Sequence, residues 1–318
     1  MNKPGTILLL CALSLVSCAP RGQKAAEPRH IQEVKIPSVY SSDEEKADYA
    51  LAHYWDGLLL GDGRTDTAMI LGVPKAEVEQ RMANYTLFLT QVPLQKARGS
   101  VGAFFNAIEK KHAADTSSHL LPAMEKIVTH YLYDPNSPMR NEDLYLPFVS
   151  RLAESEFTAA NMKPAYRHDA QMCSLNQYGQ QVPDFKFRTL KGRTMHLYGV
   201  RARYTMLFFS NPGCHACKGI IEEVMGNPVI PGMLSDGTLA VVNVYIDEDL
   251  DAWKAYAPTY PESWYSGYDP DYIIRQDLLF NVRAIPSLYL LDAEKRVIMK
   301  DAPTENVLRF MDNIAKER

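Results

Sequence analysis

Two cysteines in the second half of the chain carry the clearest chemistry in the sequence. Cys214 and Cys217 stand three residues apart in the segment NPGCHACKGI (211–220), directly after the apolar run YTMLFFS (204–210). The apolar run predicts a buried strand, the Asn-Pro-Gly triplet predicts a turn, and the residues from Cys214 onwards predict a helix. Free N–H groups and the helix dipole stabilise a thiolate at a helix N-terminus. The pattern therefore favours a redox-active dithiol, with Cys214 as the nucleophile and Cys217, one helical turn later, as the resolving thiol.

Three other uses of the cysteine pair stay open. A zinc site needs four ligands and usually two such pairs, whereas this chain has one pair, which Cys173 and a scattered histidine would have to complete. We therefore predict no metal. The second alternative is a static structural disulfide. The third is a fold of the same kind that has lost its redox function. A working dithiol is itself the redox group, so no bound cofactor is expected.

The first residues predict export from the cytoplasm. Residues 1–17 combine a short basic start with an apolar core of about ten residues, too short to cross a bilayer, which takes about 20. The end of this segment, Leu15-Val16-Ser17-Cys18, resembles a bacterial lipobox, which implies cleavage before Cys18 and attachment of lipid to it. An ordinary signal peptide in which Cys18 is incidental is the alternative. Residues 18–40, rich in proline and charge, predict a flexible tether.

The rest of the chain divides into two domains. In residues 41–172, apolar residues recur with a period near 3.6 and Gly and Pro interrupt them, which predicts an all-helical domain of five or six helices. Ser42 and Glu45 match a capping box at its start. In residues 173–318, strand-like and helical segments alternate, which is typical of an α/β domain. The predicted fold class is therefore a two-domain α+β chain. The formal net charge of −4 argues against a nucleic-acid partner.

A second motif narrows the α/β domain to a family. Ile285-Pro286 stands directly before the strand-like segment SLYLLD (287–292), and with the strand–turn–CxxC–helix unit it resembles the thioredoxin superfamily. The resemblance implies that this peptide bond is cis, that it faces the dithiol, and that the backbone before the proline pairs with the substrate peptide. A trans proline that begins a strand is the alternative. The segment VPDFKFRTLKGRTMHL (182–197) resembles the opening hairpin of the TlpA/ResA-like envelope thioredoxins, which implies an insertion, here at about 247–275.

The helical half carries a weaker resemblance. Residues 130–145 and 176–185 are similar to an uncharacterised helical domain that precedes thioredoxin domains in some Gram-negative lipoproteins. This resemblance implies an architecture and a location but no separate activity.

The sequence departs from the thioredoxin pattern around the dithiol. Phe208 stands where thioredoxin has a buried acid, and Ile220 stands where the ResA-like branch has a glutamate. Between the cysteines lies His215, whose protonated ring would stabilise the thiolate and make the couple more oxidising. An exposed histidine without a role is equally open.

Two further features have alternative interpretations. Cys173 is either a half-buried thiol near the domain junction or a third redox partner. An aromatic cluster in the insertion forms either a groove for a client peptide or a small core, and its members are Trp253, Tyr256, Tyr260, Trp264, Tyr265, Tyr268 and Tyr272.

Together these features predict a thiol–disulfide oxidoreductase of the cell envelope, anchored through lipid on Cys18 at the periplasmic face of the outer membrane. We favour a reductant over an oxidant. Its partners would be disulfide-containing envelope proteins and a separate membrane electron donor, and Ile285 with Pro286 would clamp the substrate. Two other functions stay open: a non-catalytic client-binding lipoprotein that uses the fold as a scaffold, and, third, a thiol peroxidase that forms a sulfenic acid at Cys214.

Overall fold

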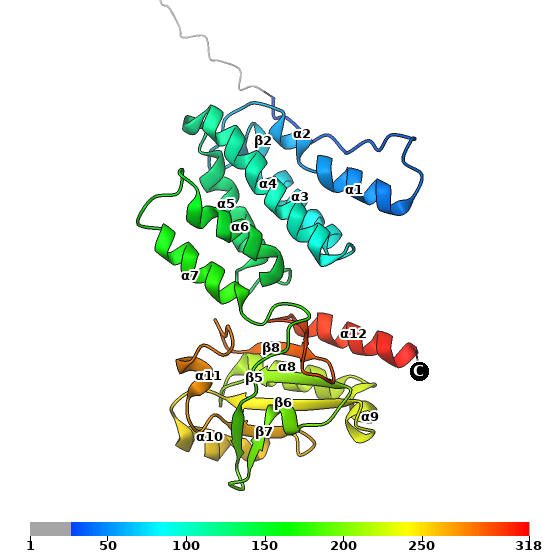
Figure 1. The fold of residues 1–318 in the computed structure, drawn as a ribbon, viewed down its shortest axis with the longest axis vertical. Helices are drawn as coiled ribbons and strands as arrows, with labels where there is room; N and C mark the ends of the chain where they lie inside the picture. Colours follow the sequence, from blue (N-terminus) through cyan, green and yellow to red (C-terminus); the bar gives the residue numbers. More distant parts are fainter. Residues whose placement is uncertain (1–26, 318) are drawn as a thin grey trace, which may run out of the picture.

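The computed structural model describes residues 27–317, which form a helical domain followed by an α/β domain (Figure 1). The order of the two domains is as predicted. The expected signal peptide (1–17), the expected lipidation site Cys18 and the first part of the expected tether lie outside the described residues. Within residues 27–317, none of the helices combines the length and the apolar character that crossing a membrane requires.

Helices build the N-terminal domain and bury one apolar core. The described residues contain a single short turn of 3₁₀ helix here, at Thr116–Ser118, and the α-helices are α1 (Asp43–His53), α2 (Asp56–Leu59), α3 (Lys75–Leu89), α4 (Leu94–Ala114), α5 (Leu120–Leu132), α6 (Glu142–Glu154) and α7 (Lys163–Ser174). These described residues thus form seven α-helices where five or six were expected. The capping box is present at the start of α1, because Ser42 Oγ accepts the Glu45 N–H and the Glu45 carboxylate accepts the Ser42 N–H, both at 3.1 Å.

A two-stranded hairpin interrupts the helices, which the sequence pattern did not predict. Strands β1 (Met69–Ile70) and β2 (Val73–Pro74) pair antiparallel around Leu71 and Gly72. Both loop residues have positive φ, 49° and 76°, as a type I′ turn requires. Strands of two residues are too short to produce a visible alternation, so the periodicity could not indicate them.

Part of the expected tether is bound to the helical domain. The Arg29 N–H donates to the Gly72 carbonyl at 2.8 Å, and its guanidinium donates to the Leu71 carbonyl at 2.6 Å. Glu33 forms a 3.0 Å ion pair with Arg81. The prediction of a flexible tether up to residue 40 is therefore wrong for this stretch, because its donors find acceptors far along the chain that composition alone cannot indicate.

The C-terminal domain is built on a seven-stranded sheet with the order β4-β3-β7-β6-β5-β8-β9 in the described residues. The strands are β3 (Lys186–Thr189), β4 (Thr194–His196), β5 (Tyr204–Phe209), β6 (Leu239–Tyr245), β7 (Tyr265–Tyr268), β8 (Ser287–Leu291) and β9 (Val297–Met299). Its helices are α8 (His215–Gly226), α9 (Ile230–Ser235), α10 (Leu250–Tyr256), α11 (Ile273–Gln276) and α12 (Thr304–Lys316). Short 3₁₀ turns at Leu197–Gly199 and Ala257–Thr259 complete the domain. The first of them lies in segment 194–200, whose strand-like pattern continues past the end of β4.

Strand β5 is the centre of this domain. All six of its residues are buried, and they alternate between two apolar clusters on opposite faces of the sheet. Met206 and Phe208 pack with α8, α9 and α12, whereas Leu207 and Phe209 pack with the strand-rich N-terminal part of the domain. Strand β5 pairs parallel with β6 and antiparallel with β8. This position makes β5 a rigid support for whatever follows Phe209.

The insertion at about 247–275 adds a strand to the sheet. It contains α10 and β7, and β7 joins β3 to β6, although no strand was predicted there. Trp253, Tyr260 and Trp264 are buried at 0%, 6% and 7% exposure, so they belong to cores and do not line an open groove. Of the aromatic residues that were considered for a groove, Tyr265 is the exposed one.

Candidate redox site

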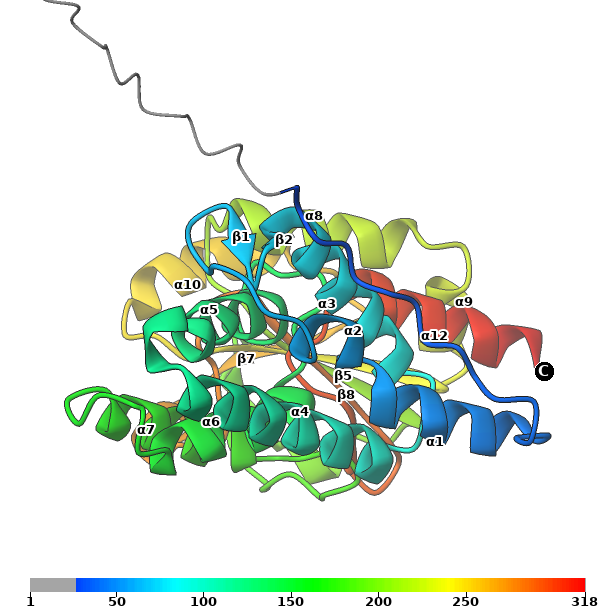
Figure 2. The same ribbon diagram turned by 90° about the horizontal axis from the view of Figure 1, so that it is seen from above.

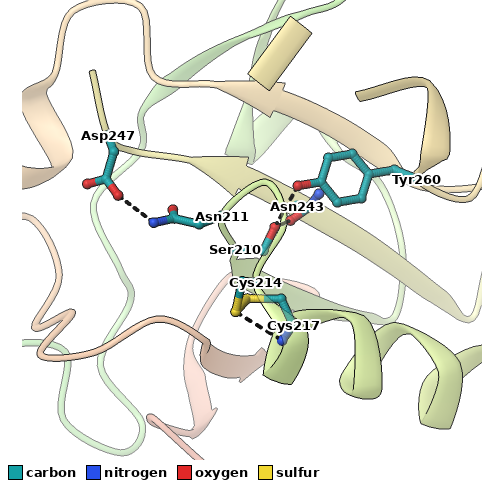
Figure 3. The surroundings of a disulfide bond; sticks show 7 residues. All are labelled: Ser210, Asn211, Cys214, Cys217, Asn243, Asp247 and Tyr260. Carbon is teal, nitrogen blue, oxygen red and sulfur yellow. Dashed lines mark hydrogen bonds between the residues drawn. A yellow bond between two sulfur atoms is a disulfide. The ribbon is translucent and has the colours of Figure 1, made fainter. Parts of the chain in front are cut away.

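Cys214 and Cys217 form a disulfide at the start of α8 (Figure 3), with their Cα atoms 5.2 Å apart, inside the usual range for such bonds. Cys214 is the N-cap of the helix, and its Sγ accepts the Cys217 N–H at 3.1 Å. After reduction, the same N–H and the helix dipole favour a negative charge on this sulfur. The structure therefore places Cys214 where a thiolate is stabilised.

The two sulfurs differ in accessibility. Cys214 is half-buried, whereas Cys217 is 2% exposed and packs in the cluster of Phe208 and Val224. An incoming disulfide can reach Cys214, and Cys217 can then attack from inside. His215, the first residue of α8, is exposed to solvent beside Cys214.

The turn between β5 and α8 is held by a chain of side chains. Asn211 Nδ2 donates to Asp247 Oδ2 at 2.6 Å (Figure 3). Asp247 Oδ1 in turn pairs with Arg275 at 2.5 Å. Gly213 has φ +69°, a left-handed conformation that favours glycine over the aromatic residue of the thioredoxin pattern. The sequence did not indicate Asp247 or Arg275, because both follow the dithiol by at least 30 residues and approach its turn only in the folded chain.

The proline loop lies at the same end of the sheet as the dithiol. The Ile285–Pro286 peptide bond is cis, as the resemblance implied. Ser287, the first residue of β8, is the register partner of Phe209, the last residue of β5. Ile285 also packs against the cluster that holds Cys217. Adjacent strand ends therefore bring the loop next to the disulfide.

Phe208 stands at the position of the family's buried acid, and a neutral polar network follows it at Ser210. Phe208 has no exposed surface, and its ring meets that of Trp264 edge to face. Ser210, the next polar residue along the chain, donates to Asn243 Oδ1 at 2.6 Å and lies 3.2 Å from the Tyr260 hydroxyl (Figure 3). Burial raises the pKa of Tyr260, so this network is uncharged at neutral pH. The absence of the acid at Phe208 was visible in the sequence. This network was not, since Asn243 has no pattern that separates it from other strand residues.

Comparisons with known proteins identify the family. The crystal structure of a thioredoxin-like protein from Bacteroides caccae ATCC 43185 is 31% identical in sequence and has a TM-score of 0.75. The match covers 89% of this chain and 98% of that one. The chain belongs to the thioredoxin-like proteins. Its residues 17–176 also match the family described as "Domain of unknown function (DUF5106)".

Two further structures are similar to the thioredoxin-like domain. The C-terminal domain of an uncharacterized protein from Bacteroides fragilis NCTC 9343 is 39% identical over 43% of this chain and 98% of that chain, with a TM-score of 0.42. The thioredoxin domain of a thiol-disulfide oxidoreductase from Bacteroides vulgatus is 16% identical over 43% and 97%, with a TM-score of 0.39. No curated protein matches the chain. The match to the Bacteroides caccae structure confirms the predicted thioredoxin resemblance and fold.

Cys173 is remote from the chemistry of the thioredoxin-like dithiol. Its side chain has no exposed surface and belongs to the core of the helical domain, whereas Cys217 belongs to a core of the thioredoxin-like domain. Burial raises the pKa of the Cys173 thiol, and the charge of Glu142 raises it further. These facts argue against a third redox partner. Among residues 27–317, no group of three or more His, Cys, Asp or Glu side chains could hold a metal ion.

Alkylation should distinguish the cysteines of the reduced native protein. With iodoacetamide at pH 8, we expect Cys214 to react at least about 100-fold faster than Cys173, because only a thiolate reacts and burial keeps Cys173 protonated. Mass spectrometry of the digested protein measures both rates. Denaturation in urea should remove the difference, and equal rates in the native protein would contradict the burial of Cys173.

A buried ionic network joins the thioredoxin-like domain to the helical domain. Glu142, the first residue of α6, is 2% exposed, and its Oε1 accepts from Asn281 Nδ2 at 2.7 Å and from Arg283 Nε at 2.9 Å. Lys300 Nζ lies 2.7 Å from Glu142 Oε2. Arg283 also donates to the Tyr133 carbonyl and lies over the Tyr133 ring, 3.9 Å from its centre. The Glu142 carboxylate of the helical domain is thus held by side chains of the thioredoxin-like domain.

A second carboxylate extends this network to the proline loop. Asp301 accepts from Arg283 at 3.1 Å and from Arg140 at 3.3 Å. Its other oxygen accepts from the Ser287 hydroxyl at 2.9 Å. Arg283 lies two residues before Ile285 and Ser287 directly follows Pro286, so both sides of the cis-proline are fixed to buried charges. No pattern in the sequence indicated any member of this network, since glutamate, aspartate, arginine and lysine side chains are usually exposed.

Proposed function

We propose that this chain is a thiol–disulfide oxidoreductase of the cell envelope. The observation that carries the proposal is the Cys214–Cys217 pair at the N-cap of α8, next to the loop that holds cis-Pro286. The accessible sulfur of Cys214, the protected sulfur of Cys217 and the backbone before cis-Pro286 are the parts that disulfide exchange needs.

The reaction proceeds in two balanced steps. The Cys214 thiolate attacks one sulfur of a client disulfide, which forms a mixed disulfide and releases the other client sulfur as a thiolate that takes up a proton. Cys217 loses its proton and attacks the Cys214 sulfur, which closes the Cys214–Cys217 disulfide and releases the second client thiol. The client gains two electrons and two protons. The backbone at Ile285, before Pro286, holds the client peptide during these steps.

We favour reduction of clients over their oxidation. In this direction the enzyme ends each cycle as the disulfide, so a separate membrane protein with a dithiol must supply two electrons. The clients are disulfide-containing envelope proteins. The lipobox resemblance at Cys18 supports a lipid anchor and a place at the periplasmic face of the outer membrane. His215 modulates the couple, because a positive charge beside Cys214 would stabilise the thiolate.

A redox titration tests this function. The full chain is equilibrated in dithiothreitol or glutathione buffers of known potential, and alkylation with mass spectrometry counts the free thiols of Cys214 and Cys217. We expect one two-electron transition, with a midpoint near about −270 mV, the potential of a reductant such as thioredoxin. A midpoint near about −120 mV would make the protein an oxidant and give His215 its role. No transition in this range would remove the oxidoreductase function and favour a client-binding lipoprotein.

A further inference from the structure

A cavity of about 500 Å³ lies between the two domains, and residues of α7 and α11 line it. Figure 1 shows α7 above α11, and Figure 2, seen from above, shows α7 at the left of the helical domain. The helical domain supplies one wall through His168, Asp169 and Met172 of α7. The thioredoxin-like domain supplies the facing wall through α11 and the residues that follow it, including Leu278. The cavity therefore exists only because the two domains are joined.

One residue of the cavity lining is connected to the active-site turn through side-chain contacts. Arg275 lines the cavity, and its guanidinium pairs with Asp247 at 2.5 Å. Asp247 in turn accepts from Asn211 at 2.6 Å, three residues before Cys214. A wall of the cavity and the turn that presents the nucleophile are thus held by the same carboxylate.

Another residue of the lining, Arg283, is close in the chain to the cis-proline loop. Arg283 lines the cavity and is fixed by Glu142, Asp301 and the ring of Tyr133. Ile285 follows two residues later, and two residues of chain span at most about 7 Å. A peptide held beside Ile285 is therefore within reach of the cavity that Arg283 lines.

The lining indicates what kind of ligand fits. Apolar side chains, among them Met172, Ile274 and Leu278, alternate with groups that form hydrogen bonds, such as Asp169, which accepts from the Tyr133 hydroxyl at 3.2 Å. Mostly apolar sites of about 300–1,000 Å³ with a few polar groups are typical for organic ligands. A phosphate-like anion fits poorly, because both cavity arginines already pair with carboxylates.

We propose that this interdomain cleft binds the polypeptide segment that flanks the client's disulfide. The inference rests on the proposed function and assigns the helical domain a part in it: α7 forms the wall against which client side chains pack while their disulfide meets Cys214. His168, an exposed residue of the cleft lining, is a specificity-determining residue. The dithiol performs the exchange, and the cleft selects polypeptides over small disulfides.

Filling the cleft tests the proposal. His168→Trp places a large side chain in it, and Arg167→Trp, a neighbouring exposed position of α7 outside the lining, is the matched control. The full chain is assayed with insulin, a polypeptide disulfide, and with oxidised glutathione, which is too short to occupy the cleft while it reacts. We expect His168→Trp to lower the ratio of the two kcat/KM values at least about tenfold and Arg167→Trp to leave it unchanged. An unchanged ratio in His168→Trp, or an equal fall in the control, would overturn the proposal.

A trapped complex provides an independent measurement. In a Cys217→Ser background, a disulfide-bearing peptide of about ten residues stays attached to Cys214 as a mixed disulfide. A photoreactive amino acid at position 168 should then crosslink to the peptide, and one at position 167 should not. Equal crosslinking at both positions, or none at 168, would contradict the proposal. If the wild type exchanges neither insulin nor oxidised glutathione, the oxidoreductase function itself fails; if it exchanges both and these variants behave alike, only the cleft fails.

Discussion

Cys214→Ser is expected to abolish catalysed disulfide exchange, with a loss of about three orders of magnitude or more in kcat/KM. A hydroxyl at this N-cap still accepts the Cys217 N–H, so the helix start is kept, but an alcohol does not ionise near neutral pH and cannot attack a disulfide. Reduction of insulin by the full chain with dithiothreitol as electron source measures the effect. Cys173→Ser is the matched control, and we expect it to retain wild-type activity.

Cys217→Ser should behave differently from Cys214→Ser. The buried Cys217 acts only in the second step, so its loss leaves the first attack intact and stops turnover at the mixed disulfide. Non-reducing electrophoresis or mass spectrometry should detect a covalent adduct between Cys214 and the client in this variant. An adduct that forms equally well in Cys214→Ser would assign the nucleophile to Cys217 and contradict the order of the two steps.

Glu142→Ala is expected to destabilise the protein by about 3–5 kcal/mol. The substitution removes the carboxylate that Arg283 and Lys300 share, while the side chains of these two cations, 14% and 2% exposed, stay buried without it. Lys300 then keeps only the carbonyls of Cys173 and Leu175 as partners, and Arg283 keeps Asp301. Buried positive charge that loses a carboxylate in this way is costly, because it has already lost its water. The change in the free energy of unfolding follows from urea denaturation at pH 7, monitored by tryptophan fluorescence.

Glu154 provides the control for this measurement. It lies at the other end of α6, its side chain is 71% exposed, and it pairs with Arg167 at the surface. Exposed ion pairs contribute about 0–1 kcal/mol, so Glu154→Ala should change stability little. If Glu142→Ala were as mild as Glu154→Ala, the interdomain network would not stabilise the join between the domains, and the cleft that depends on this join would lose its support.

Local patterns in the sequence determined the redox site in outline. An apolar run, a Pro-Gly turn and two cysteines one helical turn apart predict strand, turn and helix from neighbouring residues, and Ile285-Pro286 before a strand is equally local. The period near 3.6 likewise separated the helical domain from the α/β domain. The capping box at Ser42 was predictable because its two partners are three residues apart. These features need no knowledge of distant contacts.

The same local reasoning failed where a role depends on a distant partner. Strand β7 could not be predicted from the aromatic insertion, because its four residues form a strand only through pairing with β3 and β6 on either side. The segment around Arg29 was predicted to be a flexible tether, because the carbonyl that accepts its N–H belongs to Gly72, far along the chain.

The dithiol, its helix and its proline were thus determined by the sequence itself, since short-range sterics and hydrogen bonding fix them. Only the tertiary structure decided what surrounds them. Glu142 meets Asn281 and Arg283 across 139 and 141 residues, and Ser210 meets Asn243 across 33. Such pairs form because burial leaves a charge or a polar group no other partner, and that constraint exists only in the folded chain.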